Sequence, residues 1–225
     1  MQTFIAELKE IIQARHMLTH PFYRHWEAGT LPIEVMRKYA EQYYHLEKNF
    51  PKFLSATHSQ CDDPADRQAI TDNLYDEEHG QHNHRELWLR FAEAIGATRT
   101  MVEQSSPLPE TQSAINTFRR LSQSSAVEGA AGLAAYESQI PTVAESKLRG
   151  LAEHYAIVEK SGTDFFRVHS VLDIEHANAW WKMIEKHANG ETERDRVRQA
   201  VKAGRDALWQ FLDGVMRAYF PAHAA

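Results

Sequence analysis

The feature that most restricts the fold of this chain is a helical repeat of apolar residues in nearly every long segment. Side chains spaced three and four residues apart share one face of a helix, so each such segment predicts an amphipathic helix. No segment alternates apolar and polar residues as a half-buried strand would. The predicted architecture is an all-α bundle of about seven or eight helices. The helical stretches span residues 3–18, 21–29, 31–60, 62–80, 84–96, 110–123, 126–139, 141–155, 162–188 and 191–219.

Proline and glycine mark where these helices begin and end. Pro32 and Pro64 fall at first-turn positions, where the missing N–H is tolerated. Gly29 and Gly96 follow helical stretches, as C-terminal glycines do. Pro51 lies inside the stretch 31–60 and predicts a kink there.

Length, charge and cysteine content limit the class of protein. The chain has 225 residues, 43% of them hydrophobic, which suits one domain over residues 1–225 with a sizeable core. Its net charge is −6 and no segment forms a basic arm, so we expect no nucleic acid partner. No apolar run approaches the roughly 18 residues of a membrane span, and the amphipathic N-terminus is unlike a signal peptide. The single cysteine, Cys61, excludes an internal disulfide and a cysteine-rich zinc site, so we expect a cytoplasmic protein with no membrane association.

Two histidines and an aspartate lie close together in "FRVHSVLDIEHANAWW", residues 166–181. At about 100° per residue, His169, Asp173 and His176 project from one face of a helix. A buried aspartate needs a partner for its charge, and a cation would serve. The alternative is a partly exposed helix on which His and Asp pair without any metal.

A second group of ligand-type residues lies in "NLYDEEHGQHNHRELW", residues 73–88. Glu77 and His84 are seven apart and share a helix face if the helix continues through Gly80. Glu78 and His82, four apart, are an alternative pair that spacing alone does not exclude. A solvated, charged helix end is the non-functional interpretation of this stretch.

A third carboxylate, Glu137, follows the small apolar run "AAGLAAY". Small residues let helices approach closely, so we expect Glu137 in a tight interior, with Lys147 as the alternative salt-bridge partner. Taken with the first two groups, three helices then supply three carboxylates and three imidazoles, a set that suits iron or manganese. Six such side chains are more natural for two ions than for one, and helix bundles build di-metal sites of this kind for oxygen chemistry. The six candidate ligands are Glu77, His84, Glu137, His169, Asp173 and His176.

Three motifs carry a resemblance to a known family: "HPFYRHWEAGTLP", "DNLYDEEHGQHNHRELWLRFAEAIG" and "HSVLDIEHANAWW". Over about residues 5–218 the chain resembles the haem-oxygenase-like di-metal oxidases, within the wider group of thiaminase II and pyrroloquinoline-quinone synthase. It is most similar to the group that includes the chlamydial protein associating with death domains. The resemblance implies a haem-oxygenase-like helical bundle, a homodimer, and a metal pair of Fe/Fe or Fe/Mn. It places the ligands of that pair on the six residues above.

The resemblance also implies an unusual activity, the synthesis of p-aminobenzoate for folate from the enzyme's own tyrosine. By this carry-over Tyr23 is the aromatic precursor, Lys147 is the amino donor, and Tyr39 and Tyr136 assist as redox or hydrogen-bonding groups. Molecular oxygen and an external reductant are the implied co-substrates, and no diffusible aromatic substrate is required. The non-functional interpretation is that these tyrosines are core aromatics with satisfied hydroxyls, as most buried tyrosines are.

Three other activities compete with this interpretation. A cofactorless oxidase like pyrroloquinoline-quinone synthase would lack the full ligand set found here. A di-metal oxygenase acting on a diffusible amine or fatty acid would share the ligands and differ in the use of Tyr23. A thiaminase would need a nucleophilic cysteine deep in the bundle, whereas Cys61 lies in the polar stretch "SQCDD". The sequence contains no patch that indicates binding to a death domain.

Overall fold

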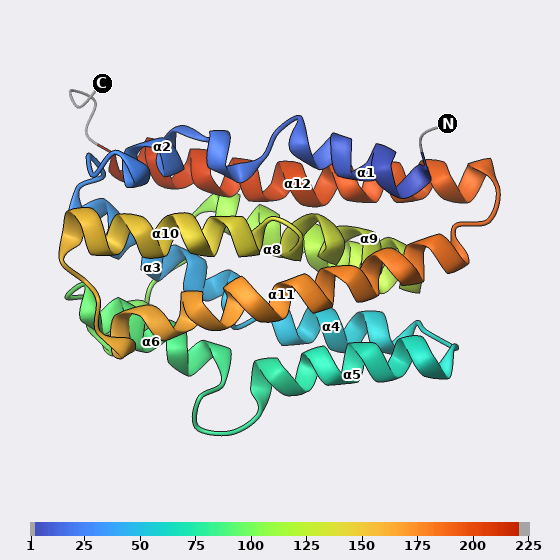
Figure 1. Ribbon diagram of the computed structural model, residues 1–225, viewed down its shortest axis with the longest axis horizontal. Helices are drawn as coiled ribbons and strands as arrows, with labels where there is room; N and C mark the ends of the chain where they lie inside the picture. Colours follow the sequence, from blue (N-terminus) through green and yellow to red (C-terminus); the bar gives the residue numbers. More distant parts are fainter. Residues whose placement is uncertain (1–2, 221–225) are drawn as a thin grey trace.

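The computed structural model describes residues 3–220 and contains only helices within that range. The all-α prediction is confirmed, and Figure 1 shows the arrangement of the bundle. The elements are α1 (Phe4–Gln13), the 3₁₀ helix η1 (Met17–Thr19), α2 (Pro21–Glu27), α3 (Ile33–Glu47), α4 (Phe50–Ser59), α5 (Pro64–Glu78), α6 (His84–Ala94), α7 (Arg99–Glu103), α8 (Pro109–Ser124), α9 (Ala126–Glu137), α10 (Ile140–Tyr155), α11 (Lys160–His187) and α12 (Glu191–Tyr219).

The chain is divided into more helices than the expected seven or eight, for local reasons. The stretch 31–60 forms two helices rather than one kinked helix, because the chain turns at Lys48 and Asn49 before Pro51. The first helix ends at Gln13 instead of continuing to residue 18, and the imidazole of His16 then caps η1 by accepting from the N–H of Leu18. The short helix α7 has no counterpart among the sequence predictions.

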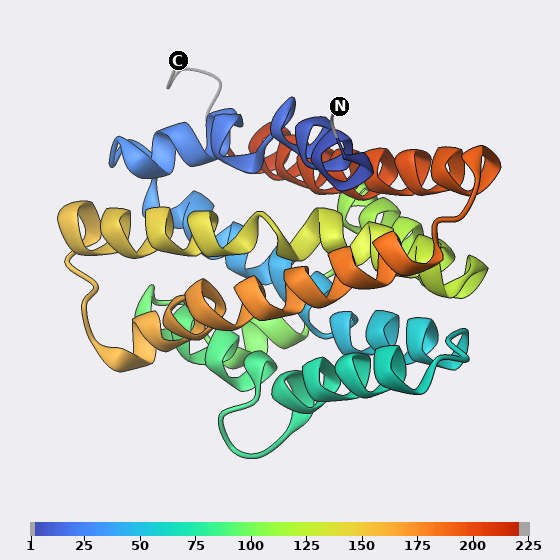
Figure 2. The same ribbon diagram turned by 45° about the vertical axis from the view of Figure 1, so that its right-hand side comes forward.

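The two long C-terminal helices organise the bundle. In Figures 1 and 2, α12 runs beside α1 and α2 at one side, and α4, α5 and α6 lie at the opposite side. Helix α11 lies between them and packs against α5, α6, α9 and α10. Functional groups on the inner face of α11 can therefore meet residues from several other helices.

Small residues on α9 allow the close packing that the sequence predicts for this helix. A Cβ atom at Gly204 of α12 would lie 3.0 Å from the carbonyl oxygen of Gly132 on α9. All residues of α9 from Gly129 to Glu137 are buried. Among residues 3–220, no helix combines the length and the apolar character needed to cross a lipid bilayer.

Candidate active site

The structure gathers all six candidate ligands into two groups of three. In each group, one donor atom per residue lies within 4.8 Å of the others. All six side chains are buried, although each of them is a carboxylate or an imidazole. The first group is Glu77, His84 and His169, and the second is Glu137, Asp173 and His176.

Helix α11 contributes one residue to the first group and two to the second, all from a single face. His169, Asp173 and His176 project inward as their spacing of four and three predicts. Nδ1 of His169 lies 2.7 Å from the carbonyl oxygen of Phe165, which can only accept. Nδ1 therefore carries the proton, and Nε2 is the nitrogen that can bind a metal ion.

Glu77 and His84 meet by a different route from the one that their spacing predicts. They do not share a helix face, because α5 ends at Glu78 and α6 begins at His84. Gly80 has a φ of +77° in the intervening turn, which favours glycine, and Asn83 caps α6 by accepting from the N–H of Glu86. The turn brings Nδ1 of His84 to 2.9 Å from Oε1 of Glu77.

The alternative pair, Glu78 and His82, lies outside this arrangement. Both side chains are exposed. His82 is occupied at the surface, where its Nδ1 lies 3.0 Å from Nη1 of Arg90. Of the two pairs that spacing left open, the structure brings only Glu77 and His84 together with a third ligand-type residue, His169, within the described range.

Glu137 is held by neutral donors and by histidine rather than by a lysine. Its Oε1 accepts from Nδ2 of Asn73 at 2.9 Å, and its Oε2 accepts from the indole N–H of Trp180. Nδ1 of His176 lies 3.4 Å from Oε1. The salt bridge to Lys147 is absent among the described residues, because Nζ of that lysine donates to Tyr39 instead.

A carboxylate behind His176 fixes the orientation of its ring. Nε2 of His176 lies 3.2 Å from Oδ2 of Asp76, at the edge of the site. Nδ1 points inward and lies 3.4 Å from both Glu137 and Asp173. Histidine ligands in metal sites are commonly oriented in this way by a second carboxylate.

Unpaired polar atoms mark where a cation fits. A buried polar atom without a partner costs about 1–3 kcal/mol, so such atoms are rare. Within residues 3–220, every buried side-chain nitrogen or oxygen without a hydrogen-bond partner belongs to this region. They are Glu47 Oε1, Asn73 Oδ1, His84 Nδ1, Asp173 Oδ2 and His176 Nδ1. The contact between His84 and Glu77 is short but too poorly aligned for a hydrogen bond, as expected if both atoms face a common ion.

Glu47 and Tyr43 belong to the site and were missed by the sequence analysis. Glu47 is buried at the C-terminal end of α3, where Glu77 and Asp173 repel its charge. Burial, with this repulsion, holds the pKa of Glu47 well above its ordinary value. One signal was available, because Tyr39, Tyr43 and Glu47 are each four residues apart and so share one face of α3.

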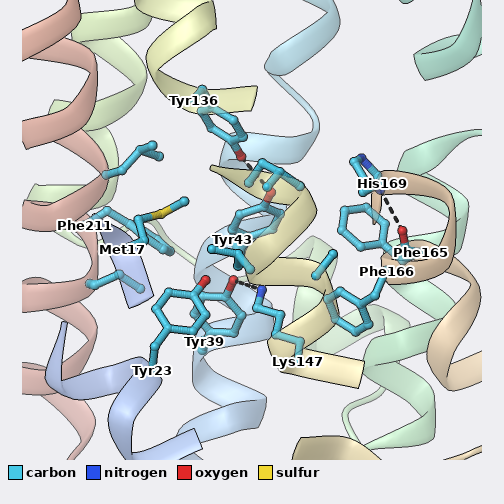
Figure 3. Close-up of a pocket in the computed structure, with 15 residues that line it drawn as sticks. Met17, Tyr23, Tyr39, Tyr43, Tyr136, Lys147, Phe165, Phe166, His169 and Phe211 are labelled. Carbon is cyan, nitrogen blue, oxygen red and sulfur yellow. Dashed lines mark hydrogen bonds between the residues drawn. The ribbon is translucent and has the colours of Figure 1, made fainter. Parts of the chain in front are cut away.

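An aromatic cavity adjoins the first ligand group. Figure 3 shows the hydroxyls of Tyr23 and Tyr39 close to the amine of Lys147, with Tyr43 next to them; His169 of the ligand group lines the same cavity farther along, beside Phe165. Nζ of Lys147 donates to the hydroxyl of Tyr39 at 2.6 Å. The cavity volume is about 20 Å³, space for roughly one water molecule. The chain's own side chains therefore fill nearly all the space on this side of His169.

Burial controls the charges in this cavity. It lowers the pKa of Lys147 to about 7, although the negative charge of Glu47 opposes this shift. Burial raises the pKa of Tyr23 and Tyr39 well above the ordinary value for a phenol. At neutral pH the phenols are protonated, and a large part of Lys147 is a neutral amine.

A pair of hydrogen-bonded tyrosine hydroxyls also lines the cavity, and one of the two tyrosines is the chain neighbour of Glu137. The hydroxyl of Tyr136 donates to that of Tyr43 at 2.7 Å (Figure 3), and Tyr136 precedes Glu137 in the chain. The structure therefore brings Tyr23, Tyr39, Tyr136 and Lys147 around one cavity. Cys61 is buried in the turn between α4 and α5 and does not line the cavity.

Comparison with known proteins places this arrangement in a family. Residues 37–209 match the family model described as an iron-containing redox enzyme. A 4-aminobenzoate synthase from Nitrosomonas europaea is 40% identical, with 96% of this chain and 92% of the relative covered. The enzyme of the same name from Chlamydia muridarum is 39% identical over 95% of this chain and 90% of its own. A pyrroloquinoline-quinone synthase from Rhizobium meliloti is more distant, at 28% identity over 97% and 86%.

Solved structures support the same fold. A TenA homolog from Pseudomonas syringae superposes with a TM-score of 0.81 at 17% identity, covering 95% of this chain and 91% of its own. A domain with a heme oxygenase-like fold from Shewanella denitrificans gives 0.79 at 18% identity, covering 95% and 90%. At these identities the likeness establishes the fold alone.

Proposed function

The chain belongs to the haem-oxygenase-like family of iron-containing redox enzymes, and from this premise we propose that it makes p-aminobenzoate for folate from its own Tyr23. Lys147 is the amino donor in this proposal, and Tyr39 and Tyr136 assist. The relatives named 4-aminobenzoate synthase support the product. The six gathered ligands support a pair of metal ions, Fe/Fe or Fe/Mn.

The observation that carries the proposal is the size and content of the aromatic cavity. A cavity of about 150 Å³ is one that accepts a benzene ring, and this one measures about 20 Å³. A diffusible aromatic substrate therefore has no space in this cavity, beside Lys147 and His169. The rings beside Lys147 belong to the protein itself, since the ring centroids of Tyr39 and Tyr23 lie 4.7 and 5.5 Å from its Nζ. This arrangement favours self-processing over the di-metal oxygenase with a free substrate.

Each group in the cavity has a role that follows from its position. When bound, the metal pair would supply activation of molecular oxygen with electrons from an external reductant. The surrounding rings exclude water from Tyr23, and Tyr39 holds the amine of Lys147 by a 2.6 Å hydrogen bond. Because burial lowers the pKa of Lys147 to about 7, the amine keeps a free lone pair at neutral pH. A neutral amine is the form that can transfer nitrogen.

The test is to identify the source of the product's atoms. Protein containing ring-¹³C tyrosine and ε-¹⁵N lysine would be supplied with iron, oxygen and a reductant but with no aromatic compound. We expect doubly labelled p-aminobenzoate, at no more than one equivalent per chain. Unlabelled product, or several turnovers with an added aromatic and an unchanged chain mass, would contradict the proposal.

Matched variants separate the roles of Tyr23 and Lys147 from general effects. Tyr23→Phe should stop release, because the product's precursor would lack its phenolic oxygen. Lys147→Arg should also stop it, because a guanidinium stays protonated. Tyr219→Phe and Lys202→Arg, both on α12 and outside the cavity lining, should release product as the unmodified protein does.

A further inference from the structure

A second, polar cavity reaches the candidate ligands from the outside of the bundle. It lies between the junction of α3 with α4 and the junction of α5 with α6, and its volume is about 190 Å³. One water molecule needs about 10–15 Å³ on this measure, so the cavity holds many. Its lining includes Glu47, Lys48 and Pro51 on one side and Glu77, Glu78 and Arg85 on the other.

The inner end of this cavity carries two buried carboxylates. Glu47 and Glu77 are each 4% exposed. Glu77 is one of the six candidate ligands, whereas Glu47 is in neither group of three. Oε1 of Glu47 has no hydrogen-bond partner, and the side chain forms no ion pair among the described residues. A buried carboxylate of this kind is either protonated or paired with a cation, and within the described residues no side-chain cation pairs with it. A metal ion that enters the cavity is therefore a partner that Glu47 can accept.

We propose that this cavity is the port through which divalent iron or manganese reaches the metal centre, and that Glu47 binds the incoming ion before it passes to Glu77, His84 and His169. The aromatic cavity on the other side of His169 measures about 20 Å³, too little for a hydrated ion. The polar cavity has the space, and carboxylate oxygen is a ligand that both metals accept. This inference rests on the proposed metal centre.

The exposed part of the port carries two positive charges, on Lys48 and Arg85, and one negative charge, on Glu78, whereas its inner end carries only the carboxylates of Glu47 and Glu77. Lys48 and Arg85 line the cavity and form no ion pair among the described residues, and both are at least partly exposed. Their charges repel an approaching divalent ion, whereas Glu47 attracts it. Charges that line a cleft change association rates by about 10- to 1,000-fold. Variants at the rim and at the inner end should therefore change the loading rate in opposite directions.

The experiment measures the rate and the extent of metal uptake separately from catalysis. Metal-free protein would be mixed with cobalt(II) in a stopped-flow instrument, and the visible absorption of the bound ion would be followed to its end point. We expect Glu47→Gln to bind two ions per chain, as the unmodified protein does, but about tenfold more slowly. Changing Lys48 and Arg85 together to Met should accelerate uptake, and added salt should reduce both effects.

Glu41→Gln is the matched control. Glu41 is a buried carboxylate on the same helix, but it is paired with Lys38 at 2.9 Å and does not line the port. It should load at the unmodified rate. Unchanged uptake in both Glu47→Gln and the rim variant would overturn the inference. Loss of one ion at the end point of Glu47→Gln would also overturn it, because Glu47 would then be a permanent ligand. No uptake by the unmodified protein would instead refute the metal centre itself.

Discussion

On the proposed function, burial prepares Lys147 for its role as amino donor. Its pKa falls to about 7 because burial removes the amine from bulk water, while Tyr39 supplies a single hydrogen bond. Below that pKa the amine is protonated and has no lone pair. The rate of p-aminobenzoate release should therefore rise about tenfold per pH unit below about pH 7 and level off above it.

This pH dependence should be measured on protein loaded with metal at one fixed pH and then transferred by rapid mixing. That order separates the titration of Lys147 from the effect of protons on metal binding. Initial rates between about pH 5.5 and 8.5 would show the inflection. A flat profile across that range would mean that the amine of Lys147 does not limit the reaction.

Tyr43 is a cavity residue that the sequence did not indicate and the structure identifies. It accepts the hydrogen bond from Tyr136, and its ring centroid lies 5.6 Å from that of Tyr39. Tyr43→Phe would leave the Tyr136 hydroxyl buried without an acceptor, which costs about 1–3 kcal/mol. We expect a fall in melting temperature of a few degrees and a loss of product yield. Tyr44→Phe, on the same helix but outside the cavity, should retain full yield.

For single residues, the spacing along the sequence predicted side-chain positions best where the helix is regular. The offsets of four and three placed His169, Asp173 and His176 on one buried face because α11 is unbroken there. Spacing did not identify Glu47, because a single Glu in "HLEKNF" looks like a solvated helix end. The burial of that residue depends on α5 and α6, which are distant in the sequence.

Among the elements, the junction of α5 with α6 is the weakest part of the site. Residues 79–82 are exposed, and Figure 1 shows the junction as a loop that projects from the bundle. Ordering a residue costs roughly 1–2 kcal/mol, and this loop has little burial to offset it. Glu77 and His84, at its two ends, should become fixed only when metal binds both.

Hydrogen exchange can test this expectation. Amides of residues 76–86 should exchange at least tenfold more slowly in metal-loaded protein than in metal-free protein. Amides of the regular part of α11 near Trp180 provide the internal reference and should change much less. Equally slow exchange across residues 76–86 in the two states would contradict the expectation.

The boundaries of the elements also show what a sequence can predict. Gly29 and Gly96 end their helices as expected, each with a positive φ. The seven-residue spacing of Glu77 and His84 predicted a shared helix face, which is wrong, because the helix ends at Glu78 and Gly80 lies in a turn; the two side chains are nevertheless close together. Tertiary packing, rather than helical geometry, restores the contact.

For the whole molecule, the central expectation is two metal ions per chain. His169→Ala removes a ligand from the first group and Asp173→Ala removes one from the second. Each variant should lose at least one ion, as measured by elemental analysis after loading with iron or manganese. His58→Ala, on α4 and in neither group, should keep both ions. Full metal content in both site variants would refute the di-metal centre.

The tight fit around Tyr23 has a consequence for the lifetime of the protein. That side chain is 2% exposed and lies against Phe22 and Tyr39 within the core. On the proposed function, removal of its ring leaves a void in the core, and losing a buried aromatic ring costs about 3–5 kcal/mol. Making product and losing stability would then be a single event. A cell could supply more p-aminobenzoate only by synthesising more chains. The spent chains would unfold more often than intact ones and would therefore be degraded faster by proteases.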